Sequence, residues 1–151
     1  MSYNDLRKGR FSEPGREYLI TTITQQRLPV FNNFYSSRIL INTLRDSEQR
    51  YDCLWLCWVI MPDHFHGLLR LNNSSPHDLS TIMKFIKGQS AKNINHHQKR
   101  TGSLWQTGFH DHALRKEEDR LNIARYIVAN PLRAGLVKRL GDWPHWDSVW
   151  L

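Results

Sequence analysis

Four stretches of the chain carry the residue pattern of β-strands. They are rich in β-branched, aromatic and other apolar residues, and they cover residues 16–24, 51–60, 64–71 and 103–115. The second stretch, "YDCLWLCWVI", is apolar on both faces, which is typical of a central strand. Pro62 and Asp63 suit a tight turn. The second and third stretches are therefore expected to form a β-hairpin.

Three further stretches place apolar residues three or four positions apart, as amphipathic helices do. They cover residues 34–50, 79–97 and about 117–130. Asn32 and Asn33 can start the first helix, Asp78 can cap the second, and Pro131 is expected to stop the third. The order strand, helix, strand, strand, helix, strand, helix predicts an α+β fold. Its sheet is expected to be mostly antiparallel, close to a ferredoxin-like unit, with the helices packed on it.

The length of 151 residues suits one compact domain over the whole chain, 1–151. Residues 1–15 are polar and basic, with Gly9, Pro14 and Gly15, and are expected to form an arm or an irregular lead-in. The tail, about 138–151, is rich in tryptophan. Cover over a cleft and packing into the core are both open as roles for this tail.

The formal net charge is +7 and the sequence pI is about 9.7. This balance favours an anionic partner, nucleic acid first, although a merely basic protein is also consistent with it. No apolar run reaches the length of a membrane helix, so a soluble, cytoplasmic protein without a membrane partner is expected. Cys53 and Cys57 lie inside an apolar strand and are expected to be buried thiols.

A histidine pair follows the predicted hairpin turn. His64 and His66 are two residues apart on one strand, so both side chains face the same way, roughly 6.7 Å apart along the chain. Two imidazoles in this arrangement can converge on one divalent metal ion. Phe65 between them would point to the other face and anchor the strand in the core. Two hydrogen-bonded or solvated histidines on a half-exposed strand are the alternative.

A second pair, His110 and His112, has the same spacing. Its middle residue, Asp111, cannot anchor a strand in a core, so this pair ranks below the first as the primary metal site. If the two strands were adjacent in the sheet, both pairs would line one cleft.

Tyr126 stands on the polar side of the third predicted helix. On a helical wheel it falls roughly 150° from the centre of the apolar arc. Asn122 and Asn130 flank it at i−4 and i+4. By pattern Tyr126 is not a core residue, and an ordinary surface tyrosine is the alternative to a special role. The apolar arc itself consists of Leu121, Ile123, Ala124, Ile127 and Val128.

Three motifs of the chain resemble the REP-associated tyrosine transposases, relatives of the single-tyrosine HUH transposases. In chain order they are "MPDHFHGLL", "SLWQTGFHDHALR" and "ARYIVANPLRAGLV". The likeness runs from about Lys8 to about Trp146. Each motif is modest alone, and the three together at this spacing are specific.

The resemblance implies an HUH endonuclease-like fold that cuts and rejoins single-stranded DNA. His64 and His66 would be metal ligands, with Phe65 in the hydrophobic position between them. Tyr126 would be the nucleophile that forms a 5′-phosphotyrosine, and Asn130 would complete the metal shell. Mg²⁺ or Mn²⁺ suits such a site, because two imidazoles and one amide leave positions for phosphate oxygens.

The resemblance also implies a substrate of DNA palindromes that fold as hairpins beside a single-stranded tetranucleotide. The residues of the arm that would help to read the tetranucleotide are Gly9, Arg10, Pro14 and Gly15. Candidates for contacts to the DNA backbone are Lys84, Lys87, Lys92 and Arg100. His110 and His112 are candidates for the DNA-binding cleft. A monomer is expected by analogy, and a dimer is also open.

Two other functions remain open at this point. A relative of these transposases can hold hairpin DNA as a regulator without cutting it. A metal-dependent hydrolase or zinc protein without a DNA role is the second alternative, but it leaves the basic charge and the Tyr126 helix unexplained.

Overall fold

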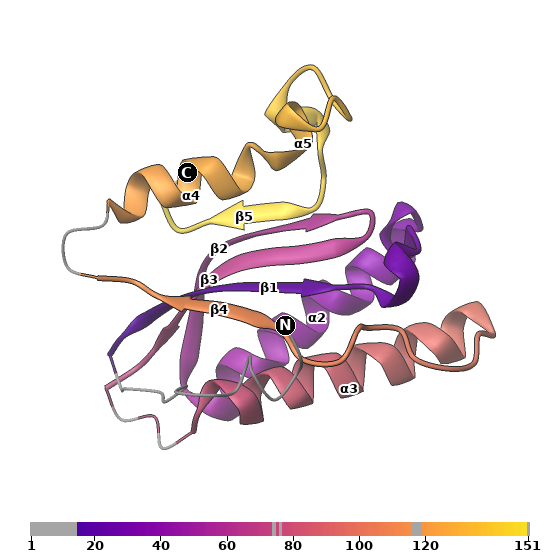
Figure 1. Ribbon diagram of the computed structural model, residues 1–151, viewed down its shortest axis with the longest axis horizontal. Coiled ribbons are helices and arrows are strands. Elements are labelled where there is room, and N and C mark those ends of the chain that lie inside the picture. Colours follow the sequence, from indigo (N-terminus) through magenta and orange to yellow (C-terminus); the bar gives the residue numbers. More distant parts are fainter. Residues whose placement is uncertain (1–14, 74, 76, 116–118, 151) are drawn as a thin grey trace.

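The computed structural model describes residues 15–73, 75, 77–115 and 119–150 (Figure 1). The strands are β1 (Glu17–Ile23), β2 (Cys53–Met61), β3 (His64–Leu71), β4 (His110–Ala113) and β5 (Trp146–Ser148). The α-helices are α2 (Phe34–Tyr51), α3 (Leu79–Gln98), α4 (Arg120–Val128) and α5 (Asn130–Arg133). Short 3₁₀ turns cover Gln25–Arg27, Val30–Asn32 and Leu140–Asp142.

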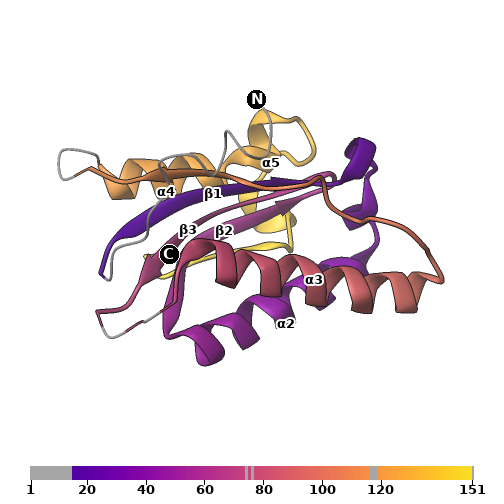
Figure 2. The same ribbon diagram turned by 60° about the horizontal axis from the view of Figure 1, so that its bottom comes forward.

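The strands form one sheet in the order β4-β1-β3-β2-β5, and every pair of neighbours is antiparallel. Helices α2 and α3 lie on one face of the sheet, while α4 and α5 lie on the other (Figures 1 and 2). This arrangement confirms the predicted α+β fold with a mostly antiparallel sheet. Within the described residues, no helix is both long enough and apolar enough to span a membrane.

The helix starts follow from local capping. Asn33 accepts a hydrogen bond from the backbone N–H of Ser36, and Asp78 accepts one from Thr81. These bonds satisfy amide groups that have no partner inside their own helix. Both capping residues are those predicted from the sequence. At the other end of α2, Asp52 adopts a left-handed conformation with φ of 50°, and β2 begins at the next residue.

The central strand β3 contributes side chains to two separate cores, because its side chains alternate between the two faces of the sheet. Phe65 is fully buried in the core beneath α2 and α3 and contacts Trp55 edge to face, with ring centroids 5.1 Å apart. Leu68 is fully buried in the second core, against Ala124 and Ile127 of α4. The prediction that Phe65 anchors the strand is confirmed. His64 and His66 share the face of Leu68, which is the face that α4 covers.

The strand predicted over residues 103–115 is mostly wrong, because only residues 110–113 pair in the sheet. Gly108 has φ of 80°, in the left-handed region, and such a residue interrupts an extended strand. Before it, the chain is drawn toward α3, where the Trp105 indole N–H donates to Ser90 Oγ at 3.1 Å. Trp105 keeps only one isolated bridge to Thr24.

One other prediction needs correction near the end of the chain, and one strand there was missed. Helix α4 ends at Val128, and Pro131 lies in the first turn of the new helix α5 instead of stopping the old one. Proline is tolerated there because a first-turn N–H has no intrahelical partner. The edge strand β5 was not predicted from the sequence, and it pairs with β2 through Cys57–Val59.

The tryptophan-rich tail packs against the second core. Trp143, Trp146 and Trp150 are all partly buried there. The Trp143 indole donates to the carbonyl of Ile60 at 3.1 Å, and the guanidinium of Arg120 lies over the Trp150 ring at 5.4 Å. The sequence left two roles open for this tail, cover over a cleft and packing into the core. These contacts are packing contacts.

Cys53 and Cys57 are free, buried thiols of β2, as predicted. Burial raises the pKa of each thiol from 9.0 to about 12. The stabilisation from these neutral thiols is complete below pH 9 and is lost as the pH rises toward 12. A thiol in this state is a poor nucleophile and a poor metal ligand near neutral pH.

The rate of alkylation tests whether the thiols of Cys53 and Cys57 are buried and protonated. At pH 8 we expect iodoacetamide to modify the native thiols at least a hundredfold more slowly than the urea-unfolded thiols. A pKa near 12 leaves roughly a thousandfold smaller thiolate fraction than a pKa near 9. Mass spectrometry over time would follow the modification, and equal rates in native buffer and in urea would contradict the burial of both groups.

Candidate functional site

The histidine pair lies at the start of the central strand β3, where two ladders fix the backbone. His64 pairs with Ile23 of β1 and with Met61 of β2. His66 pairs with Thr21 and with Val59 in the same two ladders. Both histidines are half-buried. Their direction is therefore set by the sheet and not by a mobile loop.

Each imidazole is held through its Nδ1 atom. His64 Nδ1 lies 2.8 Å from Asp63 Oδ1, and Arg27 donates to the other oxygen of that carboxylate at 3.1 Å. His66 Nδ1 contacts the hydroxyl of Thr21. Nε2 of His64 is therefore the nitrogen available to a ligand, and the His66 ring also has a hydrogen bond to the backbone of Ile20. Metal-bound histidines are usually oriented in this way, so the donor set fits a divalent ion.

The charges around the pair support the same interpretation. Burial lowers the pKa of His66 to about 4, and the charges of His64 and Arg133 lower it as well. His66 is therefore neutral at physiological pH, which is the form that binds metals. Burial alone would raise the pKa of Asp63, but hydrogen bonds from His64 and Arg27 hold that pKa below its usual range. Asp63 therefore remains a carboxylate that orients His64.

The second histidine pair lies on the same face of the sheet but two strands away. His110 pairs with Thr21, which in turn pairs with His66, and β1 separates β4 from β3. Two strand spacings amount to about 10 Å, which is too far for one ion to join both pairs. Both His110 and His112 are exposed. Across the described part of the chain, no three His, Cys, Asp or Glu side chains cluster as a metal site.

Tyr126 lies outside the core, as its position on the helix predicts. Its side chain is 62 % exposed, whereas Ala124, Ile127 and Val128 of the same helix are buried. Leu121 is an exception to the predicted apolar arc, because it remains 41 % exposed at the start of α4. Tyr126 is therefore presented to solvent by a helix that packs on the histidine face.

Arg133 covers the ring of Tyr126. Its guanidinium carbon lies 3.6 Å from the ring centroid, which is a close cation–π contact. The positive charge of Arg133 also contributes to the lowered pKa of His66. The sequence did not reveal this contact, because the two residues lie on opposite sides of the break between α4 and α5. The one sign of this contact in the sequence is that a cation follows the tyrosine by seven residues.

Asn130 is the first residue of α5. Its Nδ2 atom donates to the carbonyl of Ile127 at 3.0 Å, which leaves the amide oxygen as the atom that can accept a bond or bind a metal. Asn130 therefore begins a new short helix, whereas the sequence predicted one helix that ended at about Asn130.

The residues expected to read DNA with the arm are only partly described. Gly9, Arg10 and Pro14 lie outside the described residues. The N–H of Gly15 donates to the carbonyl of Leu71 at 2.6 Å, at the far end of β3. This point is roughly 17 Å along the strand from His66.

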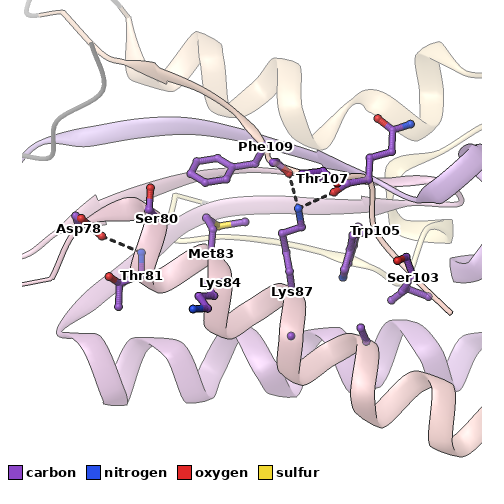
Figure 3. A pocket seen from close by; sticks show the side chains of 15 residues that line it. Asp78, Ser80, Thr81, Met83, Lys84, Lys87, Ser103, Trp105, Thr107 and Phe109 are labelled. Carbon is purple, nitrogen blue, oxygen red and sulfur yellow. Dashed lines mark hydrogen bonds between the residues drawn. The ribbon is translucent and has the colours of Figure 1, made fainter. Parts of the chain in front are cut away.

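The four cations predicted to contact DNA occupy different surroundings. Lys84 and Lys92 are exposed on α3. Arg100 is half-buried and donates to Asn95 Oδ1 at 3.2 Å. Lys87 crosses from α3 to the segment before β4, where its ammonium group donates to the carbonyls of Gln106 and Gly108 (Figure 3). Burial lowers the pKa of Lys87 to about 8, so it is still a cation at pH 7.

A cavity of about 680 Å³ lies between α3 and residues 103–109 (Figure 3). It is on the side of the sheet opposite the histidine pair, since Met83 and Phe109 of its lining belong to the core beneath α2 and α3. Lys84 lines this cavity together with the hydroxyls of Ser80 and Thr107. The cavity is thus separate from the candidate catalytic residues.

Comparison with protein families gives a match over residues 15–130 to the family described as "Transposase IS200 like". The chain belongs to this family. It is 27 % identical over 146 residues to a putative REP-associated tyrosine transposase of Haemophilus influenzae, covering 87 % of this chain and 78 % of that protein. A REP-associated tyrosine transposase of Escherichia coli is 33 % identical over 87 residues, which cover 58 % of this chain. The match spans 49 % of the E. coli protein, about half its length.

Solved structures agree with this assignment. A REP-associated tyrosine transposase bound to a REP hairpin superposes with a TM-score of 0.74 and 25 % identity, covering 91 % of this chain and 79 % of that one. A putative transposase from Deinococcus radiodurans gives a TM-score of 0.56 at 25 % identity, with 80 % and 94 % covered. These comparisons confirm the resemblance to REP-associated tyrosine transposases. The fold of the chain matches that of the REP-associated tyrosine transposase bound to a REP hairpin.

The contact between Arg133 and Tyr126 can be measured with fluorotyrosine labelling and ¹⁹F NMR. We expect Arg133→Ala to shift the Tyr126 signal, because the guanidinium that lies 3.6 Å from the ring is removed. Arg125→Ala is the matched control. Arg125 is an exposed arginine in the same helix as Tyr126, and its guanidinium bonds to Asn122 instead of covering the ring. A Tyr126 signal that stays unchanged in both variants would contradict the contact.

Proposed function

We propose that this IS200-like transposase cleaves and rejoins single-stranded DNA beside palindromes that fold into hairpins. Tyr126 is the proposed nucleophile, and the product is a 5′-phosphotyrosine on the enzyme. The observation that carries the proposal is the placement of an exposed tyrosine on the helix that covers the histidine face. The similarity to a transposase whose structure was determined with a REP hairpin supports the choice of substrate.

The proposed reaction conserves the energy of the bond that it breaks. The Tyr126 oxygen loses its proton and forms a bond to phosphorus, while the bond from phosphorus to the 3′ oxygen breaks. The 3′ oxygen takes up a proton and leaves as a free 3′-OH. No water is consumed, so this hydroxyl can later attack the phosphotyrosine and rejoin the strands.

The chain offers a ligand set for Mg²⁺ or Mn²⁺. His64 and His66 would bind through Nε2, and Asn130 would bind through its amide oxygen. When bound, a divalent ion polarises the scissile phosphate and spreads its developing negative charge. Arg133 would orient the Tyr126 ring and add positive charge on the side of the nucleophile.

The proposed DNA path follows the charge of the protein. Lys84 and Lys92 are the exposed lysines of α3 and would contact the phosphate backbone. His110 and His112 share the sheet face of His66 and would border the strand near the cleavage point. Gly9, Arg10 and Pro14, with Gly15, remain the proposed readers of the tetranucleotide. The monomer is the proposed form that acts.

A covalent-adduct experiment tests the proposed chemistry. A labelled hairpin with single-stranded flanks is incubated with protein and Mn²⁺, and denaturing electrophoresis separates DNA-linked protein. We expect an adduct with the wild type and none with Tyr126→Phe, which should still bind the hairpin. Tyr35→Phe is the matched control, because Tyr35 is equally exposed, at 63 %, and should keep the adduct.

Three results would contradict the proposal. An adduct that persists in Tyr126→Phe would mean that another residue is the nucleophile. A wild-type protein that binds the hairpin and never forms an adduct with Mn²⁺ present would favour the non-cleaving regulator instead. Tight zinc binding without affinity for single-stranded DNA would favour a function outside DNA processing.

Lys84 and Lys87 give a matched pair of variants with different expected effects. Lys84→Met should leave the thermal midpoint unchanged and lower the salt dependence of DNA binding by about one unit in slope, because one phosphate contact is lost. Lys87→Met should lower the thermal midpoint, because two carbonyl groups lose their donor. Anisotropy titrations at several salt concentrations and thermal melts would measure both. Identical behaviour of the two variants would contradict this division.

A further inference from the structure

Two large aromatic side chains are exposed at the start of α2. Phe34 is 53 % exposed and Tyr35 is 63 % exposed. Their rings meet edge to face with centroids 5.8 Å apart. Neither ring belongs to a core, and neither has a role in the reaction proposed above. Adjacent aromatic rings that remain in water are typical of a surface that binds a partner.

Three further rings adjoin this pair: His97 is exposed, Trp143 is half-buried and His145 is buried. Phe34 lies 5.6 Å from His145, Trp143 lies 5.9 Å from His145, and Tyr35 lies 5.6 Å from His97. The five residues come from the start of α2, the end of α3 and the segment before β5. We call this set, Phe34, Tyr35, His97, Trp143 and His145, the aromatic patch. Because its members come from three separate segments, the tertiary fold brings them together.

The aromatic patch lies beside the turn that leads into the histidine pair. The carbonyl of Ile60 accepts a hydrogen bond from the Trp143 indole N–H at 3.1 Å. The backbone N–H of Ile60 donates to the carbonyl of His145 at 2.9 Å. The N–H of Phe31 donates to the carbonyl of Pro62 at 3.0 Å. Figure 1 shows the start of α2 and the β2–β3 turn at the same end of the molecule. His64 follows this turn directly.

Arg38 is an exposed cation beside the aromatic patch, whereas the nearby Arg27 is paired with a carboxylate. Arg38 is exposed one helical turn after Phe34, and its charge acts on His145. Arg27 is exposed near the turn, where it bonds to Asp63. Exposed aromatic faces with nearby cations are the means by which proteins bind single-stranded nucleic acid, since bases stack on the rings while cations attract the phosphates.

We propose that the aromatic patch stacks unpaired bases of the DNA strand beside the histidine pair, with Phe34 and Tyr35 as the principal contacts. This inference rests on the proposed function and adds the position of the single-stranded segment. A second copy of the chain is the less suitable occupant. In a two-fold dimer the same patch would face itself and bring the two Arg38 side chains together, whereas the phosphates of a DNA strand neutralise Arg38.

Binding measurements with two DNA probes test the proposal. One probe is a blunt hairpin, and the other is the same hairpin with a single-stranded extension on both sides. Without added metal, we expect Phe34→Ala and Tyr35→Ala each to weaken binding of the extended probe about tenfold, with little effect on the blunt hairpin. Tyr35→Phe should bind like the wild type, because it keeps the ring. Val149→Ala, which alters an exposed apolar residue away from the patch, is the control.

A fluorescent base analogue such as 2-aminopurine reports stacking directly. Placed in the extension, it should be quenched by the wild type at one or more positions and not by the double variant of Phe34 and Tyr35. Unchanged affinity and quenching in that double variant would overturn the proposal. So would an equal loss on both probes, or a wild-type dimer that Tyr35→Ala converts to a monomer in sedimentation.

These outcomes are independent of cleavage. If the wild type forms no adduct with Mn²⁺ but the patch variants lose affinity for the extended probe, the base-stacking surface stands and the proposed chemistry fails. If the adduct forms and the patch variants bind normally, the chemistry stands and the base-stacking surface fails.

Discussion

The alternation of side chains along β3 is the constraint on which the rest of the structure depends. Phe65 fills the core beneath α2 and α3, and this fixes His64 and His66 on the opposite face. Hydrogen-bonded strands on both sides prevent β3 from slipping, because a shift by one residue would exchange the two faces. Replacement of a buried phenylalanine by alanine typically costs about 3–5 kcal/mol. The packing of Phe65 and the aim of the two imidazoles are therefore a single property of the fold.

The break between α4 and α5 gives the second half of the site. Helix α4 ends at Val128 and α5 starts at Asn130, and the guanidinium of Arg133 in α5 lies over the ring of Tyr126 in α4. A straight helix would place residues seven apart on one face but about 10 Å apart along its axis. Pro131 stabilises the new first turn. The proposed nucleophile Tyr126, the amide of Asn130 and the guanidinium of Arg133 thus lie on two helices that meet at Ala129.

The sequence predicted those parts of the structure that follow from local rules. Periodicity and capping located α2, α3 and the hairpin, and they also placed Tyr126 outside the core. Strand β5 was missed because it is a three-residue edge strand, Trp146–Ser148, whose stability comes from pairing with β2. The irregular path before β4 was missed because Trp105 and Lys87 bind it to α3 through tertiary contacts. No pattern within a single element contains such information.

If His64, His66 and Asn130 hold a divalent ion close to Tyr126, paramagnetic broadening by Mn²⁺ will reveal that arrangement. The protein is labelled with fluorotyrosine and with ¹³C-histidine and titrated with Mn²⁺ in the presence of hairpin DNA. We expect the signals of His64, His66 and Tyr126 to broaden first and together, while that of Tyr35 persists. Broadening that begins at His110 and His112, or that spares Tyr126 while His64 and His66 disappear, would contradict it.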